Sequence, residues 1–236
     1  DANAEHGHFP LDDHLAESTI AIFTTLEHWA DRRVRLLAEL AGYDEVTSYS
    51  VYQDEPLGDG HAVLQAKEWV QSDAVAVLFG DDLIFGDPTS PTGLRGAGKG
   101  NGLEQLVGAE SRIKNQELSE LVMLCLEEVA KEDVSKYGIA DVEVSDGRLK
   151  AIRGLVEKPS PEEAPGTLGI VGKYIIPRSL FLALSAVQPG QGGEIRLIDA
   201  FIDQLGTTPI YGYVFEGKRY DVGTPEGYRE AVQDLG

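Results

Sequence analysis

The sequence predicts an α/β fold with a mixed, mainly parallel sheet flanked by helices. Apolar residues run without a break from Ala74 to Phe79, a pattern typical of a central strand that is covered on both faces. A segment rich in β-branched and aromatic residues at 46–52, a glycine-bearing turn and a helical pattern at 62–70 precede this strand. Strand, helix and strand in this order form a βαβ crossover, which requires the two strands to be parallel.

The other segments extend the α/β pattern. Apolar residues recur at helical spacing over 15–40, which predicts one long helix or two. Asp146-Gly147 lies between two β-patterned runs and indicates a hairpin. Thr224 before Pro225 is typical of a helix start. Further helices are expected at 103–117, 177–187 and 194–205, and further strands at 121–126, 168–176 and 210–215.

Composition limits the domain count and the classes of partner. The 236 residues, 42% of them hydrophobic, suit a single domain over 1–236 with a sizeable core. The 40 acidic and 20 basic residues give a net charge of −20, which argues against nucleic acid and anionic membranes as partners; adaptation to high salt is another source of such a surplus. No stretch is long enough to span a membrane, and the first ten residues lack a signal pattern, so we expect a cytoplasmic protein.

Cysteine and histidine usage indicates no defined metal site. Cys125 is the single cysteine and lies in the apolar run LVMLCL, so we expect it in the core, without an internal disulfide or a thiolate zinc site. His6, His8 and His14 lie close together, but their spacing matches no defined site, and a solvated terminus is the favoured interpretation.

Two adjacent carboxylates follow the apolar strand directly after a glycine. At the carboxyl end of such a strand the backbone opens into the crevice where α/β sheets bind ligands. Asp81 and Asp82 repel each other there, and a hard divalent cation that also binds phosphates would hold them. The alternative is a strand-ending turn in which one acid caps the next element.

Residues in three further segments could bind a ligand. Gln53 offers a side-chain amide at a strand end, where it can pair with a pyrimidine base, and Gly58 allows close approach of the backbone. Glu157 can accept hydrogen bonds from sugar hydroxyls, while Lys158 can serve as a point charge for phosphate. Asp221 lies on a connection to a helix start and could meet Asp81. In each case the alternative is an ordinary turn or surface residue.

A glycine-rich segment over 86–102 follows the proposed metal ligands. It contains six glycines between Gly86 and Gly102 and two prolines, and it is expected to be a flexible loop. Such a loop could close over a substrate or be a tolerated surface insertion.

Six runs, taken together, resemble the prokaryotic UTP-glucose-1-phosphate uridylyltransferases. They are QDEPLGDGHA, VLFGDDLIF, VSKYGIADV, LVEKPSPEEAPGTLGIVGKYII, GGEIRLIDA and FEGKRYDVGTPEGY, and they occur in the order and at roughly the spacing of that family. The resemblance covers most of the chain from about residue 9 onward. It implies a Rossmann-like sheet of the nucleotide-diphospho-sugar transferase type.

The resemblance also implies roles for particular residues. Gln53 and Gly58 would bind uracil, and Asp81 would hold Mg²⁺ on the nucleotide phosphates, with Asp221 as the second metal ligand or its close neighbour. The sugar-binding residues would be Gly138, Glu157 and Gly172, and Lys158 would contact a phosphate as a catalytic residue. The family commonly has arginine where this chain has Lys173, a change that loses a bidentate fork.

The reaction implied is UTP plus glucose 1-phosphate giving UDP-glucose and pyrophosphate, by an enzyme that commonly forms homo-oligomers. The family begins with a strand and a loop of the form GxGTRxxPxTKxxPK, and no such segment occurs in these residues. We therefore expect an N-terminally incomplete chain. The alternatives are thymidylyl transfer, another sugar 1-phosphate, or a non-catalytic nucleotide-sugar-binding module.

Overall fold

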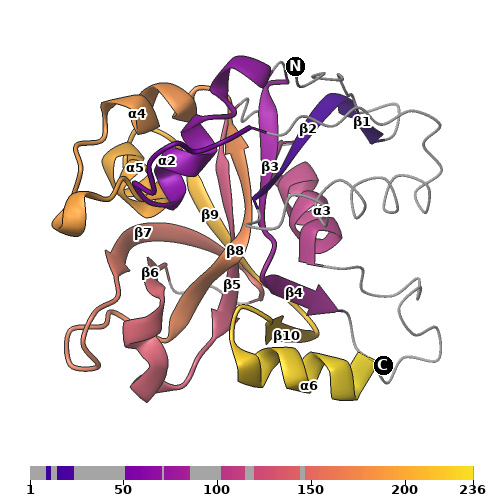
Figure 1. Cartoon of the computed structure of the whole chain (residues 1–236), viewed down its shortest axis with the longest axis vertical. Helices are drawn as coiled ribbons and strands as arrows, with labels where there is room; N and C mark the ends of the chain where they lie inside the picture. The colour runs from indigo at the N-terminus through magenta and orange to yellow at the C-terminus, as the bar shows by residue number, and fades with distance from the viewer. Residues whose placement is uncertain are drawn as a thin grey trace. The chain divides into compact units, whose positions relative to one another are not determined.

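The computed structural model in Figure 1 describes residues 9–11, 15–23, 51–70, 72–85, 102–114, 120–143 and 147–235. Two units are distinguished along the chain, one of Asp1–Gly80 with Ile176–Ala200 and one of Asp81–Ile175 with Phe201–Gly236. Within the described ranges, no helix has the length and apolar character needed to cross a membrane. The predicted positions 46–50, the loop over 86–101, Asp146 and the three N-terminal histidines lie outside these ranges.

The first unit contains parallel strands and short helices. Strand β2 (Leu15–Phe23) runs parallel to β3 (Ala74–Phe79), and β1 (Phe9–Leu11) is antiparallel to β2. Val75 and Val77 of β3 are fully buried, as the apolar run predicts. Helix α2 (Asp59–Leu64) lies beside α4 (Leu180–Ala186) in Figure 1, and the 3₁₀ helix η1 (Lys67–Trp69) follows α2.

The helix predicted from residue 15 is wrong for its first part. Residues 15–23 form the strand β2, and residues 24–40 lie outside the described ranges. Thr19, Ile20 and Ile22 are β-branched, and such residues favour strands when a partner strand is present. The backbone of β3 supplies that partner, and pairing outweighs the weaker helical periodicity.

The second unit contains a five-stranded sheet in the order β8-β5-β9-β7-β6. Its strands are β5 (Val122–Glu128), β6 (Gly138–Val142), β7 (Leu149–Glu157), β8 (Leu168–Pro177, whose last two residues belong to the first unit) and β9 (Ile210–Val214). Strands β5 and β9 are parallel, whereas β8 runs antiparallel to β5, and β7 runs antiparallel to β6 and β9. The predicted strands and the β6–β7 hairpin are therefore confirmed. The sheets are mixed, but the described pairings are mostly antiparallel rather than parallel.

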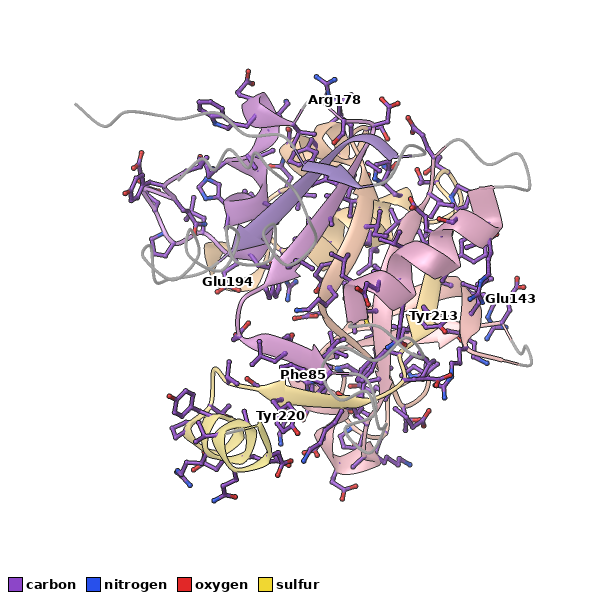
Figure 2. The ribbon with its side chains drawn as sticks, turned by 90° about the vertical axis from the view of Figure 1, so that its right-hand side faces the viewer. Phe85, Glu143, Arg178, Glu194, Tyr213 and Tyr220 are labelled. Carbon is purple, nitrogen blue, oxygen red and sulfur yellow. The ribbon has the colours of Figure 1, made fainter. Side chains whose placement is uncertain are left out.

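A short antiparallel ribbon forms the second sheet of this unit. Strand β4 (Asp82–Phe85) pairs with β10 (Lys218–Asp221), so that Asp82 lies opposite Asp221. Figure 2 shows Phe85 and Tyr220 beside each other on this ribbon. Their ring centroids are 6.0 Å apart, and the rings pack edge to face. The sequence predicts neither four-residue strand, because such short segments carry too little alternation to stand out.

Two helices contact this ribbon. Helix α6 (Pro225–Leu235) begins where Thr224-Pro225 predicts, and the Gly227 N–H donates to the Thr224 hydroxyl at 3.1 Å. Lys218 of β10 pairs with Asp234 of α6 at 2.6 Å. Helix α3 (Gly102–Lys114) confirms the helix predicted near 103–117 within the described ranges, and its Gly102 packs on the Ile84 side chain. The structure also describes the 3₁₀ helices η3 (Lys131–Lys136) and η4 (Gln191–Gly193) and the helix α5 (Leu197–Gln204).

Strand β5 is the core of the second unit. Its residues from Val122 to Leu126 have no exposed surface. Burial raises the pKa of the Cys125 thiol to about 12, so this thiol is an inert core group, as predicted.

Candidate active site

Asp81 and Asp221 converge at the end of the β4–β10 ribbon. The Val222 N–H donates to the Asp81 carbonyl at 2.8 Å, which holds the two acidic positions side by side. A Cβ placed on Gly223 would lie 3.0 Å from Asp81 Oδ2 and 3.2 Å from Asp221 Oδ1. Both carboxylates therefore approach one point, and the absence of a side chain at Gly223 leaves that point open.

Asp82 has a different environment from its neighbour Asp81. Its Oδ1 accepts from Arg219 Nη1 at 2.5 Å, and its Oδ2 accepts from the Gly172 N–H at 2.8 Å. The side chains of Arg219 and Asp82 are 9% and 13% exposed, whereas Asp81 is an exposed residue. The two adjacent acids thus separate into a paired structural group and an accessible carboxylate.

Arg219 connects three elements of the second unit. Besides Asp82, it donates to Glu127 Oε2 and to the Tyr137 hydroxyl, each at 2.7 Å. Burial alone would lower the pKa of the guanidinium, but the two carboxylates outweigh it and raise the pKa above its ordinary value. Sequence reasoning missed Arg219, and the only signal was its position two residues before Asp221.

A bulge in β8 brings one backbone N–H and one side-chain ammonium to Asp82. Val171 and Tyr174 lie opposite the consecutive residues Cys125 and Leu124 of β5, so Gly172 and Lys173 are extra residues in the register with β5. Such a bulge releases N–H groups from the ladder and redirects side chains. The Gly172 N–H accordingly donates to Asp82, and Lys173 Nζ donates to the Asp82 carbonyl at 2.5 Å. Lys173 is buried and acts here as a point charge on β4.

The expected sugar-binding residues gather at one end of the β6–β7 hairpin. Gly138 lies directly opposite Glu157, and the Lys158 N–H donates to the Tyr137 carbonyl at 3.0 Å. The Glu157 side chain is 18% exposed, whereas that of Lys158 is 61% exposed, and their charged atoms are 3.7 Å apart. The backbone of Lys158 has a φ of 46°, a left-handed conformation that costs a residue with a side chain about 1 kcal/mol.

The expected base-binding residues lie together in the first unit. Gln53 Nε2 donates to the Gly58 carbonyl at 3.0 Å and lies 2.9 Å from His61 Nδ1. Gly58 precedes α2 with a φ of 98°, and a Cβ there would lie only 2.7 Å from the Ile195 carbonyl oxygen. Both the positive φ and the close Ile195 carbonyl therefore require glycine at this position.

This turn is tied to the start of α5. The Ile195 N–H donates to the Leu57 carbonyl at 2.7 Å, and the His61 N–H donates to the Ile195 carbonyl at 3.2 Å. Asp59 Oδ1 accepts from Leu197, the first residue of α5, at 3.0 Å and from Gly60 at 2.7 Å. Burial raises the pKa of Asp59, against the effect of these hydrogen bonds. Two of the runs that carry the resemblance, QDEPLGDGHA and GGEIRLIDA, are thus joined by hydrogen bonds.

The acids at the ribbon end fit a magnesium ion that also binds water and substrate phosphates, rather than a metal whose ligands all come from the protein. Within the described ranges, no group of three or more histidine, cysteine, aspartate or glutamate residues could hold a metal. Mg²⁺ usually keeps several waters and binds one or two carboxylates together with substrate phosphates. Asp81 and Asp221 supply that number of hard oxygen ligands on an accessible side of the ribbon.

Comparison with known proteins identifies the family. A sequence model described as Nucleotidyl transferase matches residues 13–236. The UTP–glucose-1-phosphate uridylyltransferase YngB of Bacillus subtilis is 33% identical over 226 residues, which cover 96% of this chain and 69% of that protein. This chain belongs to the UTP–glucose-1-phosphate uridylyltransferases of the nucleotidyl transferase family. The resemblance recognised from the sequence runs is confirmed.

Other members of this family agree in sequence and in fold. The UTP–glucose-1-phosphate uridylyltransferase of Pseudomonas aeruginosa is 34% identical over 80% of this chain and 62% of its own length. A UDP-glucose pyrophosphorylase solved with UDP-glucose superposes with a TM-score of 0.72 at 28% identity, over 91% of this chain and 80% of that one. A UTP-bound UGPase from Acinetobacter baumannii gives a TM-score of 0.67 at 32% identity, over 89% of this chain and 68% of that one. The mixed α/β fold of nucleotide-diphospho-sugar transferases is thereby confirmed.

Proposed function

We propose that the whole protein transfers a uridylyl group from UTP to glucose 1-phosphate, giving UDP-glucose and pyrophosphate. The observation that carries this proposal is the convergence of Asp81 and Asp221 on one open point beside Gly223. The names of the relatives support the substrates, since the solved neighbours include complexes with UDP-glucose and with UTP. This chain spans 69% of the Bacillus protein and 62% of the Pseudomonas protein, so the proposal concerns the full-length enzyme.

The chemistry needs position and charge neutralisation rather than a protein nucleophile. An oxygen of the glucose 1-phosphate group attacks the α-phosphorus of UTP, and the bond from that phosphorus to the oxygen bridging to the β-phosphate breaks. Pyrophosphate leaves with the electron pair of that bond. The attacking phosphate is already an anion, so orientation and electrostatic stabilisation supply the rate enhancement.

Asp81 and Asp221 would hold Mg²⁺ against the nucleotide phosphates. When bound, the ion withdraws charge from the α-phosphate. Arg219, Gly172 and Lys173 fix Asp82 and with it the start of β4. Their contribution is to keep Asp81, the preceding residue, at a constant place relative to Asp221.

Lys158 would contact the phosphate of the sugar substrate. Its side chain is 61% exposed, and it follows directly after the last residue of β7. The neighbouring Glu157 would accept hydrogen bonds from glucose hydroxyls, and Gly138, opposite it, would provide backbone contact. Gly172 would contribute by its lack of a side chain, because its N–H already donates to Asp82.

Gln53 and Gly58 would bind the uracil. The Gln53 amide nitrogen lies 3.0 Å from the Gly58 carbonyl and 2.9 Å from His61 Nδ1, so the amide oxygen is the group that would accept the uracil N3–H. We also propose that the protein works in the cytoplasm and that it forms a homo-oligomer, as the family resemblance of the sequence implies.

The experiment that tests this function is pyrophosphate release by the full-length protein with a panel of nucleotides and sugar phosphates. We expect UTP with glucose 1-phosphate to be the best pair. A preference for dTTP with glucose 1-phosphate would replace the uridylyl assignment with thymidylyl transfer. Absence of turnover, together with binding of UDP-glucose, would favour the non-catalytic binding module.

The same assay tests the metal ligand. Asp81→Asn should lower turnover by about 100-fold or more with the fold intact. Asp203→Asn removes one carboxylate from the exposed side of α5 and is the matched control, expected to keep its activity. A variant Asp81→Asn with near-normal activity in Mg²⁺ would end the assignment.

A further inference from the structure

His61 lies between two side-chain amides in the first unit. Its Nδ1 is 2.9 Å from Gln53 Nε2, and its Nε2 is 3.1 Å from Gln65 Nε2. All three side chains are partly buried. The two ring nitrogens of a neutral histidine differ, since one carries a proton and the other accepts a hydrogen bond. Only one of the two amides can therefore donate to this ring.

The Gly58 carbonyl contributes to the orientation of the Gln53 amide. It lies 3.0 Å from Gln53 Nε2 and also accepts from the Ala62 N–H at 3.1 Å. If the Gln53 amide were turned over, its oxygen would face this carbonyl oxygen, and two acceptors would be in contact without a hydrogen. Gln53 must therefore direct its nitrogen inward, and its second amide hydrogen points to His61 Nδ1.

The Gln65 amide also has a backbone carbonyl as an acceptor. Its Nε2 donates to the His61 backbone carbonyl at 3.0 Å, within the same helical turn. Of the two amide nitrogens, that of Gln53 lies closer to the ring, at 2.9 Å against 3.1 Å, which favours Gln53 as the donor to the single acceptor nitrogen of the imidazole. This arrangement requires His61 in the tautomer that carries its proton on Nε2.

We propose that His61 is a specificity-determining residue that selects uracil over cytosine by fixing the orientation of the Gln53 amide. With both hydrogens of its nitrogen used, Gln53 presents only its carbonyl oxygen to a ligand. Uracil and thymine carry a donor at N3, whereas N3 of cytosine is an acceptor. The fixed oxygen attracts the first and repels the second. This inference rests on the proposed function, in which Gln53 binds the base.

Without His61, the amide loses one of the two contacts that orient it. The Gly58 carbonyl remains as an acceptor, but an amide with one orienting contact in place of two turns outward more readily and then offers either its oxygen or its nitrogen to the base. A site whose polar group has one fixed orientation rejects the wrong partner strongly, whereas an adaptable group does not. His61 therefore acts on discrimination between bases, and it acts through Gln53 rather than by touching the base.

The test compares kcat/KM for UTP with kcat/KM for CTP in the full-length protein and three variants. His61→Phe keeps a ring but removes the acceptor, and it should lower the UTP-to-CTP ratio about tenfold or more. His61→Asn, whose side-chain oxygen can lie near the place of Nδ1, should restore most of the ratio. Gln65→Ala is the control and should leave the ratio unchanged. An unchanged ratio in His61→Phe would overturn the inference.

Two further measurements separate this inference from the proposed function. Gln53→Ala should raise KM for UTP; if it changes neither KM nor the ratio, Gln53 does not bind the base and the proposed base site fails. If it raises KM while His61→Phe leaves the ratio unchanged, the base site stands and the role of His61 fails. Nitrogen NMR of the unmodified protein should show the proton of His61 on Nε2. A proton on Nδ1 would refute the inference even if the His61 variants did not fold.

Discussion

Replacement of Arg219 by methionine should destabilise the second unit strongly. Methionine keeps most of the side-chain volume but leaves Asp82 and Glu127 without the guanidinium that lies 2.5 and 2.7 Å from them. Removing one partner of a buried ion pair costs about 3–5 kcal/mol, because the remaining charge stays in a poorly solvated place. Asp82 is 13% exposed and keeps the Gly172 N–H, while Glu127 is 28% exposed and can be hydrated, so we expect the lower end, about 3 kcal/mol.

Urea unfolding followed by circular dichroism measures this loss directly. For a chain of this size, about 3 kcal/mol corresponds to a fall in Tm of roughly 6–12 °C. Arg219→Lys is the matched control, since it keeps the charge but not the fork that reaches Asp82, Glu127 and Tyr137, and it should lose less. Adding Asp82→Asn to Arg219→Met should recover part of the stability, with a coupling energy of about 1–3 kcal/mol. A loss below about 1 kcal/mol in Arg219→Met would refute the reasoning.

Two further predictions concern groups away from the ribbon. Asp59→Ala should cost about 1–2 kcal/mol, because the Gly60 and Leu197 N–H groups lose their acceptor, and urea titrations would show it. Burial raises the pKa of Asp59, so the folded state holds the proton of this carboxyl more tightly than the unfolded state does. The free energy of unfolding of the unmodified protein should therefore fall as the pH rises from the ordinary pKa of 3.8 through the raised folded pKa, and Asp59→Asn should lack this slope. Absence of the slope from the unmodified protein would contradict the assignment. The Cys125 thiol, whose pKa burial raises to about 12, should react with a thiol reagent at pH 8 only on unfolding, and rapid labelling of the native protein would show the core to be open.

The sequence is informative where local chemistry decides the structure. The apolar run of β3, the Thr224-Pro225 start of α6 and the hairpin around Gly147 all depend on residues close in the chain, and all three are found as predicted. Cys125 is likewise buried, as its apolar neighbours predict. These features need no knowledge of distant partners.

Features that depend on distant partners are harder to predict. The antiparallel course of β8 beside β5, and the strand at 15–23, follow from pairing rather than from periodicity. The hydrogen bond between Asp59 and Leu197 joins residues 138 positions apart. The sequence runs that contain these residues are recognisable, but nothing in either run indicates that it contacts the other.

The candidate site shows the same division. The meeting of Asp81 and Asp221 is expected from the resemblance, while the β4–β10 ribbon that produces it is too short to be read from alternation. Arg219, which separates the roles of Asp81 and Asp82, has no sequence signature of its own, since a single basic residue near an acid is ordinary on a surface. Its partners become visible only in three dimensions.

Calorimetric titration of UTP into the full-length protein, with and without Mg²⁺, tests most directly whether Asp81 and Asp221 share one ion at the nucleotide phosphates. Mg²⁺ should strengthen UTP binding in the unmodified protein and in Asp203→Asn, and this gain should be lost in both Asp81→Asn and Asp221→Asn. The same gain from Mg²⁺ in all four proteins would contradict the account.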